Sequence, residues 1–163
     1  MESRQSSNSF LNGAALFLLM LITGVFWGTW FTLTRSLSEF PPSEFIHIGK
    51  AIIANVATPM KILMPAGILL VAFSVWLKRK NDQARFFFGV LSLILIVAVL
   101  LITLFVLVPI DNDIKTWTES TIPKDFESIR AKWKSYHAVR TFLSLASFAS
   151  FSAFSLMKNK STP

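Results

Sequence analysis

The chain has 163 residues, of which 53% are hydrophobic and only 15% are charged, and its formal net charge is +7. Water-soluble domains carry about 25% charged residues, so this composition excludes an ordinary soluble enzyme and a disordered chain. A nucleic-acid-binding protein is excluded as well, because the cations lie at the ends of apolar segments and form no stripe with stacking aromatic residues.

Four stretches contain no Asp, Glu, Lys or Arg, namely 5–34, 62–77, 86–110 and 141–157. A helix needs about 20 apolar residues to cross a bilayer. The pattern predicts an all-α integral membrane four-helix bundle with spans at about 10–33, 61–77, 86–110 and 135–157. No repeat or linker is present, so residues 1–163 are expected to form a single membrane domain.

The first span, 10–33, contains Gly24 and Gly28 at the GxxxG spacing that allows another helix to approach closely. Trp27 and Trp30 lie near its end, where tryptophan residues commonly mark the boundary between membrane and water.

The next segment, 44–58, follows two prolines and is only moderately apolar, so it is predicted to be an interfacial helix. Pro59 and Pro65 each remove a backbone donor and are expected to bend or break the helix that leads into span 61–77.

A short cationic connector, 78–85, leads to the aliphatic span 86–110. A second interfacial helix is predicted at about 124–134, before span 135–157. Small residues recur along this last span and would allow its neighbours to pack closely.

The charges predict an orientation. An even number of spans places both termini and connector 78–85 on one side, which carries seven cations and two acidic residues, a net charge of +5 out of +7. Cations crowded beside span ends in short loops favour the cytoplasm. We therefore expect an N-in/C-in protein of the plasma (inner) membrane.

Three residues on the opposite side form a candidate site. Trp133, His137 and Arg140 stand at i, i+4 and i+7, and so share one helix face. For a phenol or enol, Arg140 could stabilise the oxyanion and His137 could remove a proton, while Trp133 stacks on the ring. The alternative is an interfacial Trp beside His and Arg residues that bind lipid headgroups.

A metal site is a weaker hypothesis. Glu44 and His47 form one E-x-x-H motif, and His137 with Asp111 could complete a two-His, carboxylate set. Four-helix di-metal proteins use two such motifs and two further Glu residues, so no metal is predicted. Phosphate-loop, dinucleotide and serine-nucleophile signatures are absent from the sequence, and the absence of cysteine excludes thiolate ligands. No cofactor is predicted either.

Three segments together resemble a known family. They are Pro41-Pro42-Ser43-Glu44-Phe45-Ile46, Val108-Pro109-Ile110-Asp111-Asn112 and Arg130-x-x-Trp133-x-x-x-His137-x-x-Arg140-Thr141. Over about residues 10–157 the chain resembles the family of four-helix membrane proteins that includes the anthrone oxygenases of polyketide pathways.

The resemblance implies a compact membrane bundle. In a few members it also implies oxidation of a hydrophobic phenolic substrate by dioxygen, without a known flavin, haem or metal. Carried over by position, the polar set would be Asn112, Trp133, His137 and Arg140, with His47 as a further substrate-binding candidate. An anthrone is a weak carbon acid whose enolate can itself reduce oxygen, so the protein needs only a base, an oxyanion partner and a dry pocket.

Two functions follow as hypotheses. The first is a membrane protein that binds a lipophilic small molecule in the outer half of the bundle, with cofactor-independent oxygenation of phenolic or anthrone-type substrates as its specific form. The second is a non-enzymatic scaffold or assembly partner, suggested by the GxxxG pair. Expected partners are membrane lipid, a lipophilic substrate and a second copy of the chain in a homo-oligomer.

Overall fold

A computed structural model describes residues 2–78 and 82–157 of the protein. Its elements, in chain order, are α1 (Glu2–Thr32), the 3₁₀ helix η1 (Thr34–Glu39), α2 (Pro42–Lys78), α3 (Gln83–Ile102), the π-helical segment η2 (Thr103–Leu107), α4 (Val108–Thr116) and α5 (Phe126–Leu156).

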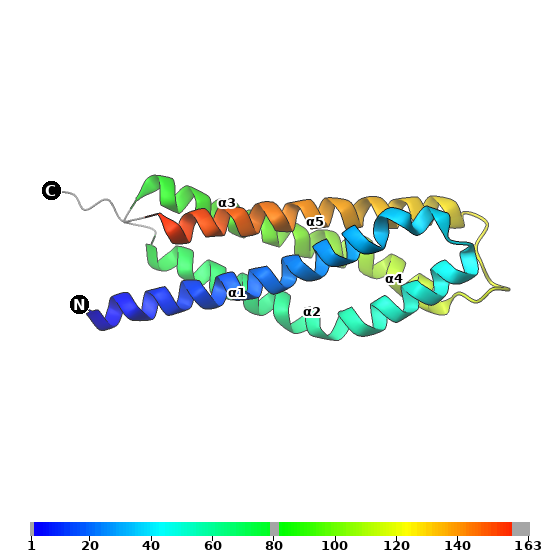
Figure 1. Ribbon diagram of the computed structural model, residues 1–163, viewed down its shortest axis with the longest axis horizontal. Coiled ribbons are helices and arrows are strands. Elements are labelled where there is room, and N and C mark those ends of the chain that lie inside the picture. The colour runs from blue at the N-terminus through cyan, green and yellow to red at the C-terminus, as the bar shows by residue number, and fades with distance from the viewer. Residues whose placement is uncertain (1, 79–81, 158–163) are drawn as a thin grey trace.

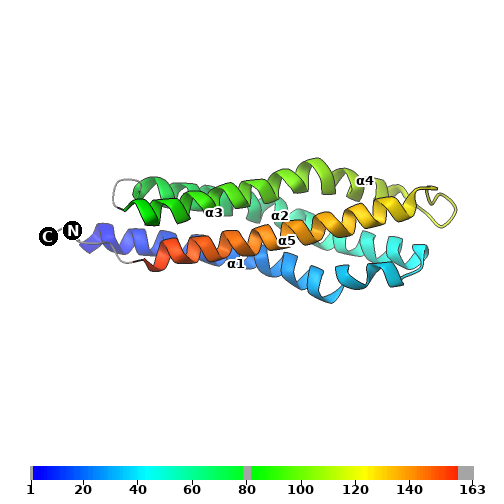
Figure 2. The same cartoon turned by 90° about the horizontal axis from the view of Figure 1, so that it is seen from above.

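The described chain is all-α, as predicted. Four helical segments are long and apolar enough to cross a membrane: Ser9–Glu39, Pro42–Lys78, Gln83–Thr116 and Phe126–Leu156. Figure 1 shows them side by side, with the start of α1 and the end of α5 at the same end of the bundle. The view from above confirms this arrangement (Figure 2). The protein is thus a multi-pass, membrane-type four-helix bundle.

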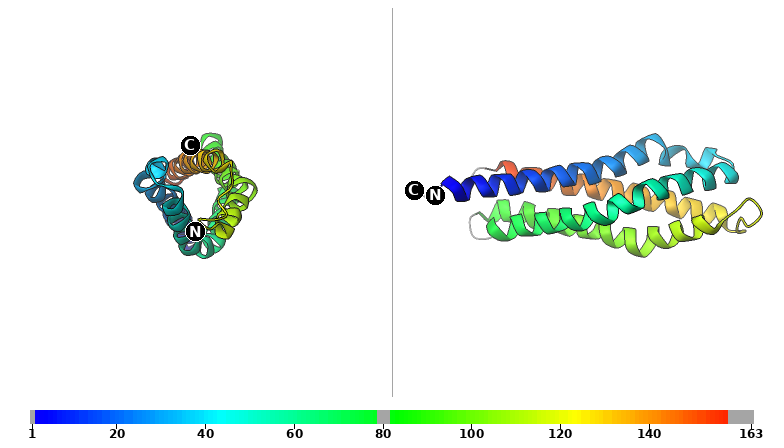
Figure 3. Two further views of the ribbon diagram at one scale, coloured as in Figure 1. Left: turned by 90° about the vertical axis from the view of Figure 1, so that its right-hand side faces the viewer. Right: turned by 90° about the horizontal axis from the view of Figure 1, so that it is seen from below.

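The helices form a ring, which Figure 3 shows end-on. In this ring α1 packs against α2 and α5, and α3 also packs against α2 and α5. Helices α2 and α5 therefore lie diagonally opposite each other.

The helices are longer than the predicted spans. The predicted interfacial helix 44–58 and span 61–77 join into the continuous α2, and 124–134 joins 135–157 in α5. Pro59 and Pro65 lie inside α2 without interrupting it, since proline has a helical φ and each ring removes only one N–H donor. Figure 1 shows the expected bend as a bow in the middle of α2.

Two hydrophobic cores lie along the bundle axis. The terminal-end core lies between the middle of α1 and the end of α5, and its fully buried members include Leu19, Val71, Ile96, Phe151 and Phe154. The loop-end core lies where η1, α4 and the start of α5 meet, and its members include Leu37, Phe45, Leu107, Ile114 and Trp133.

Helices α3 and α5 approach closely within the terminal-end core. Ser92 Oγ donates to the Ser147 carbonyl at 2.9 Å, and Ser147 Oγ donates to the Ser92 carbonyl at 2.9 Å. A Cβ atom at Gly89 would lie 2.7 Å from Val75 Cγ2 and 2.9 Å from Phe154 Cδ2. Small residues at these positions therefore set the spacing of the two helices, as expected for helix packing in membranes.

The GxxxG pair of α1 has no such role inside the bundle. A Cβ atom at Gly24 or Gly28 would meet nothing within 4 Å, and Gly24 is exposed. In α2 the close approach occurs at Gly67, where a Cβ atom would lie 2.9 Å from Ile22 Cδ1.

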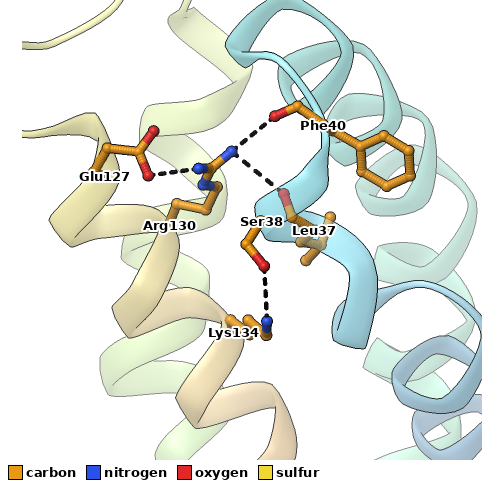
Figure 4. Close-up of polar contacts among 6 residues, drawn as sticks. All are labelled: Leu37, Ser38, Phe40, Glu127, Arg130 and Lys134. Carbon is orange, nitrogen blue, oxygen red and sulfur yellow. Dashed lines mark hydrogen bonds and ion pairs between the residues drawn. The ribbon is translucent and has the colours of Figure 1, made fainter.

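A buried arginine holds the connection between α1 and α2 against α5 (Figure 4). Arg130 Nη1 donates to the carbonyls of Phe40 at 2.8 Å and Leu37 at 3.3 Å, and Nη2 donates to Glu127 at 2.5 Å. Lys134 Nζ adds a bond to Ser38 Oγ at 3.1 Å. Leu37 and Phe40 lie at the end of η1, where carbonyl groups commonly lack a helical partner, so these contacts close the loop end of the bundle.

We expect Gly89→Ala to destabilise the bundle by about 1–3 kcal/mol, because the added methyl group overpacks the contact between Gly89 and its neighbours on α2 and α5. Gly24→Ala is the matched control, since it gives the same gain in helix propensity while its new Cβ atom meets nothing within 4 Å. Thermal unfolding midpoints of the purified, detergent-solubilised variants measure the difference, and equal midpoints would contradict the packing described here.

Candidate functional site

A cavity of about 390 Å³ lies inside the bundle, within the range of known small-molecule sites. It is located between the two cores, because Phe26, Met60 and Met64 of the terminal-end core and Ile53 and Trp133 of the loop-end core all line it. The bow of α2 and the π-helical segment η2 border this space. Most of the wall is apolar, formed by residues such as Val25, Ile52, Val56, Leu100 and Val108.

Four polar side chains gather on one part of this wall. Trp133, His137 and Arg140 come from α5 and Asp111 from α4. The three α5 residues are 1%, 6% and 8% exposed, so this face of α5 turns into the bundle. Val139 and Phe142, on the outer face of the same helix, are about half exposed. The inward orientation agrees with a binding site and disagrees with an anchor in the headgroup layer.

Helix α4 and helix α5 are joined at the site by one hydrogen bond. Trp133 Nε1 donates to Asp111 Oδ1 at 2.8 Å. The indole ring itself packs against the imidazole of His137, with ring centroids 4.0 Å apart, and meets the ring of Phe45 edge-on at 5.7 Å. Trp133 thereby positions both the carboxylate and the imidazole, and its predicted stacking on a substrate stays a prediction.

The Arg140 guanidinium is held by two contacts inside the bundle. Its Cζ atom is 4.1 Å from the ring centroid of Phe26, a cation–π contact that partly compensates for lost hydration. Its Nη2 atom lies 2.9 Å from His137 Nδ1. A guanidinium can only donate hydrogen bonds, so Nδ1 is the acceptor and the imidazole proton is on Nε2.

Two polar atoms of this pair have no protein partner. His137 Nε2 and Arg140 Nε are both buried, and neither makes a hydrogen bond within the described residues. Leaving a buried donor unsatisfied costs about 1–3 kcal/mol. Both donors belong to residues that line the same cavity, so they are candidates for hydrogen bonds to a bound ligand.

The other two candidate residues lie elsewhere. Asn112 is exposed, and its Oδ1 accepts a bond from Lys115 Nζ at 3.0 Å. His47 is also exposed, and neither residue lines the cavity. Asp111 takes the position toward the cavity because it shares a helical face with the buried Leu107 and Ile114, whereas Asn112 is rotated away by about 100°. That i, i+4, i+7 pattern was the signal that sequence reasoning missed.

The proposed metal ligands do not come together. In the ranges 2–78 and 82–157, no three His, Asp or Glu side chains are grouped closely enough to hold an ion. Glu44 and His47 are exposed at the start of α2, outside the cavity that contains His137 and Asp111.

We expect Trp133→Phe to lower the free energy of unfolding by about 1–3 kcal/mol, because the indole N–H that satisfies the Asp111 carboxylate is lost while most of the ring remains. Trp27→Phe is the matched control, since Trp27 is 38% exposed and packs on Phe31, with no hydrogen bond from its indole N–H to any described residue. Thermal midpoints in the same detergent would show the larger shift for Trp133→Phe, and equal shifts would remove the hydrogen bond as a source of stability.

A comparison with known protein families identifies the family of the chain. The family model described as anthrone oxygenase matches residues 53–150, a segment that contains Asp111 and the three α5 residues of the site. No curated protein and no solved structure gave a match. Because the matched segment is more than half of the chain, the protein belongs to the anthrone oxygenase family.

Proposed function

We propose that the cavity binds a lipophilic aromatic molecule that carries an ionisable oxygen, and that the protein oxidises an anthrone-type substrate with dioxygen. The observation that carries this proposal is the combination of an apolar wall with four clustered polar side chains, two of which offer unpartnered N–H donors. A cavity of about 390 Å³ is suited to a multi-ring aromatic molecule, and a position inside a membrane-type bundle suits a substrate that partitions into lipid.

The proposed reaction converts the methylene carbon of an anthrone to a carbonyl. One atom of dioxygen becomes the new carbonyl oxygen, and the other leaves as water together with the two hydrogens of the methylene group. Dioxygen is the oxidant, and the electron-rich enolate of the substrate is the reductant. The protein's part is to bind the ring, promote loss of the first proton, stabilise the oxyanion and exclude bulk water.

Arg140 is suited to oxyanion stabilisation. It is a buried cation, and its hydrogen bond to His137 and its contact with Phe26 hold it in place. A preorganised charge in a water-poor site stabilises developing negative charge far more than the same charge in water. An enolate or phenolate oxygen beside Arg140 would also satisfy the free Nε donor.

The scaffold alternative is less well supported. It expects Trp133, His137 and Arg140 to face lipid headgroups, whereas all three line the cavity. The exposed face around Gly24 leaves room for a second copy of the chain, so a homo-oligomer is compatible with the binding function.

The proposed function is tested with His137→Ala/Arg140→Ala in the full-length protein, assayed in lipid nanodiscs for anthrone oxidation. Loss of the donors and of the cation should reduce turnover by about 10²-fold or more. Lys132→Ala is the matched control, because Lys132 lies on the exposed face of α5. A double variant that elutes and melts as a folded protein and still turns over at the wild-type rate would refute the assigned roles.

We also propose that both termini lie in the cytoplasm and that the loop between α4 and α5 lies outside the plasma (inner) membrane, from the +5 charge of the terminal side. The chain has no cysteine, so a single cysteine substitution introduces one thiol at a known position, and its labelling reports the side of the membrane on which that position lies. Ser120→Cys should react with a membrane-impermeant maleimide on intact cells, and Ser3→Cys only after permeabilisation. The reverse labelling pattern would invert the topology.

A further inference from the structure

The polar groups around the cavity divide into donors and acceptors. His137 is held with its proton on Nε2, because Arg140 Nη2 donates to Nδ1 at 2.9 Å. The imidazole therefore has no free lone pair in this arrangement. Two buried side-chain atoms of the cavity wall lack a partner within the described residues, His137 Nε2 and Arg140 Nε, and both are N–H donors. A donor can bind an oxyanion, but it cannot remove a proton.

Asp111 is the acceptor of the site. Its Oδ1 atom accepts the bond from Trp133 Nε1 at 2.8 Å, and a carboxylate with about four lone-pair positions has further capacity. Asp111 lines the cavity from α4, whereas His137 and Arg140 line it from α5. A ligand between them would meet donors on one side and a carboxylate on the other.

The other polar side chains of the wall do not compete for this role. The hydroxyl groups of Thr29 and Thr103 donate to the carbonyls of Val25 and Val99 in their own helices, each at 2.8 Å. Lys61 is an exposed cation where α2 borders the cavity. A second positive charge on His137 would stand beside the Arg140 guanidinium, which also favours the neutral imidazole as donor.

We propose that Asp111, and not His137, accepts the substrate proton, while His137 Nε2–H and Arg140 bind the oxygen that becomes negative. This inference rests on the proposed function and specifies its substrate class: an aromatic ketone with an acidic C–H conjugated to the carbonyl. The C–H bond breaks, the proton moves to an Asp111 carboxylate oxygen, and the electron pair moves to the ketone oxygen to form an enolate. Trp133 is a positioning residue that keeps the carboxylate toward the cavity.

Proton transfer can be measured without the oxidation step. Anthrone is incubated with the full-length protein in nanodiscs under anaerobic conditions in D₂O, and deuterium uptake at its methylene carbon is followed by mass spectrometry. Wild-type protein should accelerate uptake over protein-free nanodiscs. Asp111→Asn should remove about 10²-fold or more of that acceleration, although its amide oxygen can still accept the Trp133 bond.

His137→Gln is the discriminating variant. The glutamine amide keeps an N–H donor but has no basic nitrogen, so exchange should stay within about 10-fold of wild type if His137 acts as a donor. Asp113→Asn is the matched control, because Asp113 is exposed on the same helix as Asp111 and does not line the cavity. It should exchange at the wild-type rate.

The outcomes separate this inference from the proposed function. Exchange at background in His137→Gln with full exchange in Asp111→Asn would assign the base to His137 and overturn the inference alone. Wild-type protein that quenches its tryptophan fluorescence on binding 1,8-dihydroxyanthraquinone, yet accelerates no exchange, would also overturn it. Absence of both binding and anthrone turnover would overturn the proposed function. If Asp111→Asn does not fold, His137→Gln decides the question by itself.

Discussion

The burial of the Arg140 guanidinium inside an apolar bundle is the constraint on which the rest of the site depends. A buried charge is strongly unfavourable unless other groups compensate for its lost hydration. Here the imidazole of His137 accepts one of its N–H groups and the ring face of Phe26 lies 4.1 Å from its central carbon. The hydrogen bond from Arg140 to His137 in turn determines which nitrogen of His137 carries the proton, and so which N–H groups remain available to a ligand.

Helix α5 carries these groups and is held at both ends. Near its start, Arg130 donates to the carbonyls of Leu37 and Phe40 at the end of η1. Toward its end, Ser147 exchanges hydrogen bonds with Ser92 of α3. The two cores pack around these anchored ends. The middle of the bundle, where α2 bows outward, is left as the cavity. Rigid elements on either side of a cavity hold its polar groups in a defined geometry, which preorganised binding requires.

Much of the architecture could be predicted from local pattern. A charge-free stretch long enough to cross a bilayer satisfies its backbone N–H and C=O groups within its own segment when it forms a helix. The four helices could therefore be predicted from the four charge-free stretches. The shared face of Trp133, His137 and Arg140 followed from helical periodicity. The continuity of α2 through Pro59 and Pro65 was not predictable in the same way. Each proline removes one backbone hydrogen bond, and packing against α1 and α3 can compensate for that loss, whereas an isolated helix has no such compensation.

The sequence by itself determined the helix number, the apolar character of the protein and the residue types available for chemistry. Only the tertiary structure decided which of them meet. Asp111 and Asn112 are adjacent in the chain, and the rotation of α4 against the loop-end core places one beside Trp133 and the other at the exposed surface. Whether His137 acts as a base or as a hydrogen-bond donor depends on its contact with Arg140. Composition and residue spacing do not specify the geometry of that contact.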